Sequence, residues 1–492
     1  MSCQLPTDCL NEIFEYLEDD KNTLYSCLLT NRFWCEIAVR ILWKDIWNFI
    51  NHRSYQTHVP LTIISTLVAG LPNESKEILY KNGIFISSPT SKPLLFNYAS
   101  FCKVLSILGI SRIIRHILEK QQFITSRNLN YCQYLILYEI LKMFMNEVSS
   151  LKSLDYDLGN PIEIQDITFT FFPGAKNCLK DLSELICSSD IHYEFFYQLS
   201  QICHNIQSLT IEFGETISNG ITDLISLQKN LKHVTLIYYS YKEYGTEITT
   251  SLTKFSSSLT KLIIKEKGSY TPLSFISTFT NLQELILSFE FGGFDFNRLQ
   301  YVTFSQLKVL KFLCTIPEVD MLIKFLEING KNLKELYMRD SYSLLNSAIA
   351  KFCPNLKSLF TIFLDDELET LKMILNNCQY LESIKVWCGD YYLNEKDLLN
   401  IIANYSPKTF YELKIVFDGE ESKLVSNDLE SFFISWKNRL SQLPLSLIII
   451  KDHESISLEV NEDNMKVIKK YMKMGFLKKF RTKQYYEELE FI

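Results

Sequence analysis

The chain has 492 residues, enough for several domains or for one continuous repeat array. With 47% hydrophobic and 22% charged residues, its composition is that of a globular protein and excludes an intrinsically disordered chain. The net charge of −7 argues against a nucleic-acid binder, because such a protein normally needs a basic face to neutralise phosphates.

The first residues carry neither the basic segment nor the apolar core of a signal peptide. No run approaches the roughly 18 apolar residues of a membrane span, and the best candidate, residues 134–145, is interrupted by Glu139 and Lys142. The 13 cysteines contain no Cys-x-x-Cys pair, and the few histidines lack ligand spacing. We therefore expect an intracellular protein of the cytoplasm or nucleus, with reduced and mostly buried cysteines, no metal, no cofactor and no membrane contact.

The chain opens with a stretch, residues 5–47, whose apolar residues recur at helical spacing in three short runs. Pro6 suits the first residue of a helix, where its missing N–H is no loss. The runs are Leu10–Leu17, Leu24–Leu28 and Phe33–Leu42, and the acidic residues 18–20 end the first of them. The stretch therefore predicts three short helices.

Three helices in about 43 residues bury too little apolar surface among themselves. They indicate either a helical cap on the next domain or a docking module whose apolar face another protein completes. The deciding pattern is Leu5-Pro6, then Leu10-x-x-Ile13-Phe14-x-x-Leu17, then Leu24-x-x-Cys27-Leu28, and a close with Trp34, Trp43 and Trp47. This pattern resembles the F-box motif at its usual N-terminal position.

The F-box resemblance implies a docking partner, the Skp-family adaptor, and through it a cullin-based ubiquitin ligase. An F-box protein performs no bond chemistry in such a complex; it holds a substrate near a charged ubiquitin-conjugating enzyme, so that proximity does the work. The residues that match the motif are the expected adaptor-binding residues: Leu5, Pro6, Leu10, Ile13, Phe14, Leu17, Leu24, Cys27, Leu28 and Trp34.

Residues 48–149 predict a helical connector. Helical patterns occupy residues 61–71, 101–119 and 131–148, and the clearest loop is the Ser/Pro-rich segment 87–93.

Further along, a pattern of the Leu-x-x-Leu-x-Leu type recurs, with Ile, Val, Phe or Met replacing some leucines, as in NLQELIL at 281–287. The clear copies follow one another at steps of 23 to 29 residues, close to the window of roughly 20–29 residues for leucine-rich repeats. Their central apolar residues are Leu209, Val234, Leu262, Leu285, Leu310, Leu336, Leu359, Ile384 and Leu413. Weaker copies centre on Leu154, Leu182 and Leu447.

Each copy predicts one strand and one returning helix. Leu285 and Leu287 have the period-2 spacing of a strand with one buried face, and the rest of the repeat suffices for a helix that returns to a parallel neighbour. Cys203, Cys353 and Cys378 each precede the first apolar position of their copy by three residues, which predicts buried cysteines and resembles the cysteine-containing subclass usual in F-box proteins. The Asn or Cys that often follows the strand in this family is inconsistent here, so the repeat count and the turns stay open.

The expected fold class is therefore α/β. It comprises a three-helix F-box at 1–47, the helical connector at 48–149, a leucine-rich-repeat solenoid at 150–464 with a curved parallel sheet and outer helices, and a terminal cap at 465–492. The last segment is basic and then acidic. A basic run can bind nucleic acid or membrane, but a polar cap that shields the last repeat is the favoured interpretation.

The sequence carries no phosphate-binding loop, no His-Glu-x-x-His and no Gly-x-Ser-x-Gly string. Cys203 stands beside His204, as a catalytic pair could, but its repeat position already explains it. We therefore expect a non-catalytic protein.

The strand residues that alternate with the buried ones should point into the concave face of the solenoid. They are the expected substrate-binding residues: Lys311, Tyr337, Arg339, Phe360, Lys385, Trp387 and Lys414. Tyr, Trp and Arg dominate binding energy at protein interfaces, although aromatic residues on a sheet are also good strand formers. For the cluster we favour binding.

The function we expect is that of the substrate-recognition subunit of a Skp–cullin–F-box ubiquitin ligase. A non-ligase F-box scaffold that binds a protein partner, and an enzyme with a site assembled from scattered residues, are the alternatives.

Overall fold

The computed structural model describes residues 6–47, 59–87, 93–121, 124–125, 128–156, 167–239, 246–267, 273–290, 295–340, 342–419, 421–439, 443–451 and 455–485. The chain forms two compact units. The first consists of Met1–His233 with Gly245–Lys254, and the second of Val234–Tyr244 with Phe255–Ile492.

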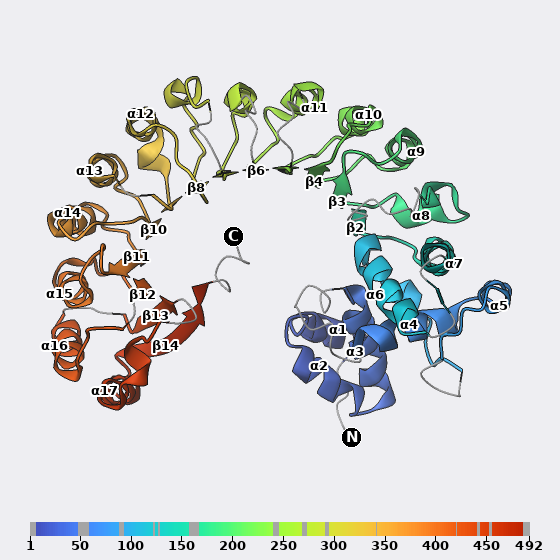
Figure 1. Cartoon of the computed structure of the whole chain (residues 1–492), viewed down its shortest axis with the longest axis horizontal. Coiled ribbons are helices and arrows are strands. Elements are labelled where there is room, and N and C mark those ends of the chain that lie inside the picture. Colours follow the sequence, from blue (N-terminus) through green and yellow to red (C-terminus); the bar gives the residue numbers. More distant parts are fainter. Residues whose placement is uncertain are drawn as a thin grey trace. The chain divides into compact units, whose positions relative to one another are not determined.

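The first unit begins with the three predicted helices, α1 (Thr7–Glu15), α2 (Lys21–Leu28) and α3 (Arg32–Lys44), as Figure 1 shows. Pro6 occupies the cap position just before α1, one residue earlier than predicted. Side-chain caps start the other two helices: Asp20 accepts a hydrogen bond from the Thr23 N–H at 3.1 Å, and Asn31 accepts one from the Trp34 N–H at 2.9 Å. Short polar residues at helix starts therefore fix where α2 and α3 begin.

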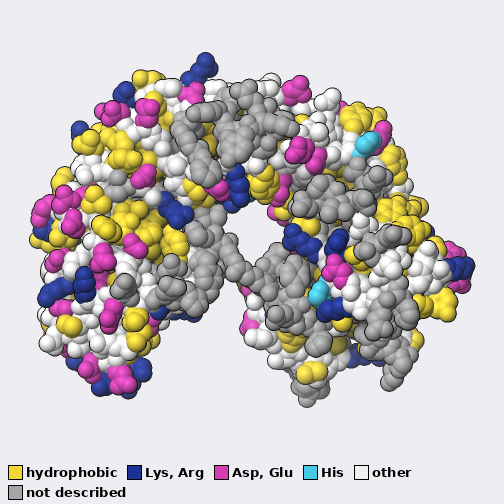
Figure 2. All heavy atoms as spheres, in the orientation of Figure 1, with side chains coloured by type: hydrophobic (Ala, Val, Ile, Leu, Met, Phe, Trp, Pro, Cys, Tyr) yellow, Lys and Arg dark blue, Asp and Glu magenta, His cyan; other side chains and the backbone are white. Residues whose placement is uncertain are grey.

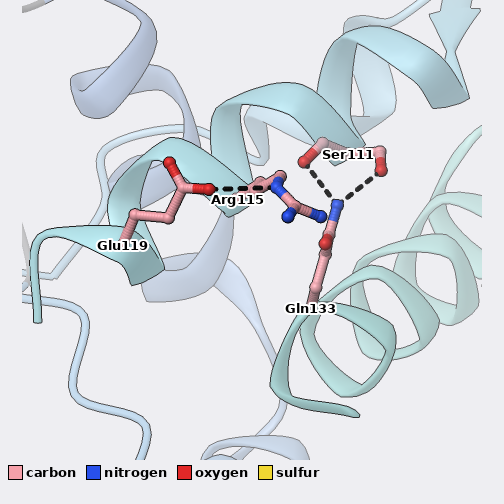
Figure 3. Close-up of polar contacts among 4 residues, drawn as sticks. All are labelled: Ser111, Arg115, Glu119 and Gln133. Carbon is pink, nitrogen blue, oxygen red and sulfur yellow. Dashed lines mark hydrogen bonds and ion pairs between the residues drawn. The ribbon is translucent and has the colours of Figure 1, made fainter. Parts of the chain in front are cut away.

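The connector forms helices that cover the first strands of the unit. They are α4 (Val59–Gly70), α5 (Asn73–Lys81), α6 (Ile107–Glu119) and α7 (Leu129–Glu147). Gln133 on α7 is buried, and its side-chain amide donates to the Ser111 carbonyl and hydroxyl oxygens of α6 at 2.9 and 2.8 Å (Figure 3). Arg115 pairs with Glu119 on α6, at 3.0 Å. The buried amide is thus satisfied and fixes how α6 packs on α7.

Parallel strands follow in chain order within the first unit. They are β1 (Val104–Ser106), β2 (Ser153–Tyr156), β3 (Glu184–Ser188) and β4 (Ser208–Phe213), with helices α8 (Ala175–Leu179), α9 (Tyr193–Ile202), α10 (Gly220–Leu227) and α11 (Thr246–Leu252). Strand β5 (His233–Tyr238) begins where the first unit ends. In register, Leu154 pairs with Leu185 and Leu185 with Leu209, so the centre of the β3 repeat is Leu185, not the predicted Leu182.

The second unit repeats the same strand–helix alternation. Its strands are β6 (Lys261–Glu266), β7 (Glu284–Phe289), β8 (Val309–Phe312), β9 (Glu335–Met338), β10 (Ser358–Phe360), β11 (Ser383–Gly389), β12 (Glu412–Asp418), β13 (Leu445–Lys451) and β14 (Leu477–Gln484). Its α-helices are α12 (Val319–Asn329), α13 (Ser343–Phe352), α14 (Leu368–Asn377), α15 (Glu395–Tyr405), α16 (Ser426–Lys437) and α17 (Glu462–Lys473). Within this unit the strands lie along the inner side and the helices along the outer side (Figure 1).

The register confirms the repeat pattern read from the sequence. Leu262, Leu285, Leu310, Leu336 and Leu359 pair laterally, each with the next, and the same line continues through Ile384, Leu413 and Leu447. All of these residues are buried between sheet and helices. The strands extend beyond the predicted array of 150–464, since β1 begins at Val104 and β14 ends at Gln484. The fold class is the predicted one, a helical N-terminal part followed by parallel strands with helices on one side.

Side chains at the ends of several repeat helices bond to the backbone of the preceding repeat. The Cys203 thiol donates to the Leu179 carbonyl at 3.0 Å, and the Gln228 amide donates to the Cys203 carbonyl at 2.9 Å. Cys203 and Cys378 are buried as predicted, and burial raises the pKa of both thiols to about 12. These thiols are held protonated as structural side chains and are not poised for nucleophilic chemistry.

Asn329 performs this role between β8 and β9. Its side-chain oxygen accepts a hydrogen bond from the Phe304 N–H at 2.7 Å, and its amide donates to the carbonyls of Val302 and Phe325 at 2.9 and 3.2 Å. We expect Asn329→Ala to lower the free energy of unfolding by about 2–4 kcal/mol, because it leaves a buried N–H and a buried carbonyl unpaired. Urea unfolding and amide hydrogen exchange of β8 and β9 measure this loss.

The control is Asn355→Ala, which removes a single bond to the Lys331 carbonyl near the surface. We expect a change within about 0.5 kcal/mol for this control. Equal effects of the two substitutions would contradict the buried role of Asn329.

The final helix α17 carries charges of both signs, whereas the charged residues of β14 are all basic. Around α16 and α17 acidic and basic side chains are interspersed on the surface (Figure 2). Lys470 lies 2.6 Å from Glu430, and Lys466 lies 2.8 Å from Asp463. The last strand continues the sheet, because β14 pairs with β13, and the capping role of this segment stays a prediction.

No helix among the described residues has the length and apolar character needed to cross a membrane.

Candidate protein-binding surfaces

The F-box helices bury part of the motif in a core of their own. Its buried residues are Leu10, Phe14, Leu24, Cys27, Ile37, Ala38, Ile41 and Leu42, with Leu17, Leu28, Phe33, Trp34 and Trp43 packed around them. The rings of Phe14 and Trp34 meet edge to face, with centroids 5.3 Å apart. The three helices therefore bury more apolar surface among themselves than the sequence suggested.

The ten predicted adaptor-binding residues consequently divide into three groups. Four are buried in the core of the module: Leu10, Phe14, Leu24 and Cys27. Pro6 and Ile13 are exposed, and Leu17, Leu28 and Trp34 are half-buried. Leu5 lies outside the described residues.

The outer face of α1 presents an apolar row, of which the sequence motif had included only Ile13. Ile13 is 47% exposed and Tyr16 is 91% exposed, and Cys9 is exposed one turn before Ile13. Residues spaced by three and four positions lie on one side of a helix, so these three side chains form a row. On α2, Tyr25 is also exposed, and Leu29, which follows the last residue of that helix, is 89% exposed. Large apolar residues on a small module indicate a surface that another protein covers.

An apolar pocket of about 580 Å³ lies beside this module, between α2, α3 and α4. Leu28, Leu42 and Trp43 line it on the F-box side, and Ile63 and Tyr98 on the connector side. Tyr25 also lines this pocket, so the pocket extends the apolar surface around Tyr25.

The F-box is anchored to the connector through its closing tryptophans. The Trp47 indole N–H donates to the Val104 carbonyl of β1 at 2.7 Å, and Trp47 is 3% exposed. The ring of Trp43 packs on that of Tyr98, with centroids 4.7 Å apart. Trp43 and Trp47, which were part of the motif, therefore hold the module onto the first repeat.

The second candidate surface is the sheet face of the second unit that points away from the helices. Strand register places one residue of each strand in a lateral row, and this row is Ile263, Ile286, Lys311, Tyr337, Phe360, Lys385, Lys414, Ile448 and Arg481. Five of the seven predicted substrate-binding residues belong to it. Trp387 lies two residues beyond Lys385 on the same face of β11, in register with Val416.

The aromatic residues of this row are covered, although we expected them to be open. Tyr337 is 9% and Phe360 is 4% exposed, and their rings lie 4.3 Å apart. The Lys385 ammonium lies over the Phe360 ring at 4.8 Å, where the ring face attracts a cation. Trp387, Arg339, Lys311 and Lys414 are half-buried. The row is thus a packed aromatic and cationic surface.

Two lysines of the row are paired with glutamates on the same or the next strand. Lys311 lies 2.7 Å from Glu335, and Lys414 lies 3.0 Å from Glu412. An ammonium group has three N–H donors, so one such pairing leaves capacity for a second acceptor.

Within the described parts of the chain, no group of three or more His, Cys, Asp or Glu side chains is placed to hold a metal ion.

Residues 2–48 match the family model described as F-box-like. A search among curated protein sequences finds no match. Among solved structures, the chain resembles one described as the crystal structure of the Rad7 and Elc1 complex in yeast, with 11% identity, a TM-score of 0.38, and coverage of 72% of this chain and 90% of that one. It also resembles the leucine-rich repeat-containing protein LegL7 from Legionella pneumophila, with 12% identity, a TM-score of 0.31, and coverage of 67% and 93%. The chain carries an F-box-like domain at its N-terminus, followed by leucine-rich strand–helix repeats.

Proposed function

We propose that this chain is the substrate-recognition subunit of a Skp–cullin–F-box ubiquitin ligase in the cytoplasm or nucleus. The F-box-like module at residues 2–48 is the observation that carries the proposal, because it presents exposed apolar residues on a folded core. In this role the module docks to a Skp-family adaptor, and the adaptor links the chain to a cullin. The repeats bind the protein substrate.

The contribution of the chain to the reaction is proximity. Holding a substrate beside a charged ubiquitin-conjugating enzyme raises the effective concentration of the reacting groups, so no catalytic residue is required of the receptor. The buried, protonated cysteines of the repeats agree with a non-catalytic role.

The exposed row on α1 is the proposed centre of the adaptor interface. We expect Ile13→Glu to weaken binding to a Skp-family adaptor at least tenfold, because a charge replaces an apolar side chain that the partner would desolvate. Because Ile13 is half-exposed, the fold of the module should survive. Co-expression followed by titration calorimetry on the purified pair measures the loss.

The matched control is Ile78→Glu on α5, an isoleucine that is 38% exposed and lies outside the F-box. It should leave adaptor binding unchanged. Adaptor binding that survives Ile13→Glu combined with Tyr16→Glu would rule out the α1 row as the interface.

Adding a cullin to the same assay separates a ligase subunit from the alternative, an F-box scaffold that recruits no cullin. A ternary complex supports the ligase, and a stable binary complex that excludes the cullin supports the scaffold.

A further inference from the structure

The sheet face of the second unit buries apolar side chains that no helix covers. Its buried members are Ile286, Leu313, Tyr337, Phe360, Val416, Ile448 and Ile450, with Ile263, Trp387 and Tyr485 packed against them. Val416 is 2% exposed and Ile450 is fully buried, yet both alternate with the residues that face the helices. Other parts of the chain must therefore lie over this face.

Tyr485 is one such residue, and it shows how the chain turns after β14. Its ring lies 5.7 Å from the ring of Trp387 on β11, and its hydroxyl accepts a hydrogen bond from Arg339 Nη2 at 2.5 Å. The Arg339 guanidinium also lies over the same ring at 5.5 Å. Since β12 and β13 separate β14 from β11, Tyr485 reaches back across the face.

The seven residues that follow are Tyr-Glu-Glu-Leu-Glu-Phe-Ile, at 486–492. They lie outside the described residues, but their chemistry complements the face onto which Tyr485 leads. Three are glutamates, and the face carries the cations Lys311, Lys385, Lys414 and Arg481 in one lateral row. Four are large and apolar, and the same row holds Tyr337, Phe360 and two isoleucines at its β6–β7 end.

An unfilled hydrogen-bond donor agrees with this placement. Among the described residues, the buried indole N–H of Trp387 has no hydrogen-bond partner. A backbone carbonyl or a carboxylate crossing beside Tyr485 is the acceptor that such a donor needs.

We propose that residues 486–492 bind in cis to this sheet face and that the face is a binding surface for acidic peptides with aromatic residues. The tail is then an internal competitor for the surface, and a partner segment of the same chemistry must displace it. That the displacing partner is a ligase substrate rests on the proposed function, whereas the binding of the tail in cis does not.

The test uses a fluorescent synthetic peptide with the sequence of residues 486–492 and the full chain in three forms. These are the intact chain, a chain ending after Tyr485, and the intact chain with Glu487→Lys, Glu488→Lys and Glu490→Lys. A tethered segment competes at an effective concentration near millimolar. We therefore expect the peptide to bind the shortened and charge-reversed chains at least tenfold more tightly than the intact chain, as measured by fluorescence anisotropy.

Two matched controls define the chemistry. A peptide with glutamine in place of each glutamate should bind the shortened chain at least tenfold more weakly, and Lys414→Glu with Arg481→Glu in the shortened chain should weaken the original peptide similarly. The charge-reversed chain keeps its full length, so it serves as the test if the shortened chain misfolds.

Equal peptide binding by all three forms, or no binding to either altered form, would overturn the proposal. The assay contains no adaptor and no cullin. Its failure is therefore distinct from a failure of the proposed ligase function, which the binding of adaptor and cullin decides.

Discussion

Phe14→Ala is expected to unfold the F-box module and to abolish adaptor binding. Phe14 is 1% exposed, and its ring packs edge to face against Trp34 inside the three-helix core. Truncating a buried phenylalanine costs about 3–5 kcal/mol, which is a large share of the stability of so small a module. Hydrogen exchange of the α1–α3 amides measures this loss locally, which matters because a chain of two units need not unfold in one step.

Two nearby positions, Tyr16 and Ile13, provide the controls for this expectation. Tyr16→Ala alters a side chain that is 91% exposed and should leave amide protection unchanged. Phe14→Ala removes fold and binding together, whereas Ile13→Glu removes binding alone. Full protection of α1–α3 in the Phe14 variant would show that the described core does not hold the module together.

Gly389→Ala should destabilise the second unit by at least about 3 kcal/mol. Gly389 ends β11 with φ of 144°, a conformation that residues with a side chain rarely adopt, and an added Cβ would lie 1.6 Å from the Asp418 carbonyl oxygen of β12. The substitution must therefore push β11 and β12 apart at this end. The midpoint of urea unfolding and hydrogen exchange of β11 and β12 report the effect.

Gly475→Ala separates the cost of the positive φ from the cost of the clash between the added Cβ and β12. Gly475 also has a positive φ, 80°, but an added Cβ there meets no atom within 4 Å. Only the backbone strain remains, and we expect a cost of about 1–2 kcal/mol. If the two alanine variants were equally stable, the close approach of β12 to Gly389 would not be a constraint on the fold.

The sequence predicted the repeat register well because the pattern is local and strongly periodic. Each Leu-x-x-Leu-x-Leu copy places its own central residue, and Leu285, Leu310 and Leu336 pair laterally as their spacing indicated. The strands at the ends of the sheet were harder to recognise. β14 keeps only the first two apolar positions of the pattern, Leu477 and Phe480, among lysines and an arginine, so its copy of the repeat is weak.

Which individual side chains are exposed at the candidate surfaces was harder to predict from the sequence. Ile13 and Phe14 are neighbours in the same helical stripe, and only the packing of α1 on α3 decides that Phe14 is buried and Ile13 exposed. On the sheet face, alternation predicted correctly that Tyr337, Phe360 and Lys385 share one row. It did not predict that the row is covered, because the contact between Arg339 and Tyr485 joins residues 146 positions apart.

Chimaeric proteins built from this chain would have to keep the hydrogen bond between the Trp47 indole and the Val104 carbonyl. A fragment cut after residue 47 loses the acceptor for that indole and exposes Trp43 and Trp47 to water, even though it contains the whole motif. The smallest transplantable piece therefore includes helices α4 to α7 and strand β1 with its partner β2. The end of the motif and the end of the cooperatively folding piece differ here by about one hundred residues. An F-box exchanged at the end of the motif would therefore lack the connector residues on which it packs.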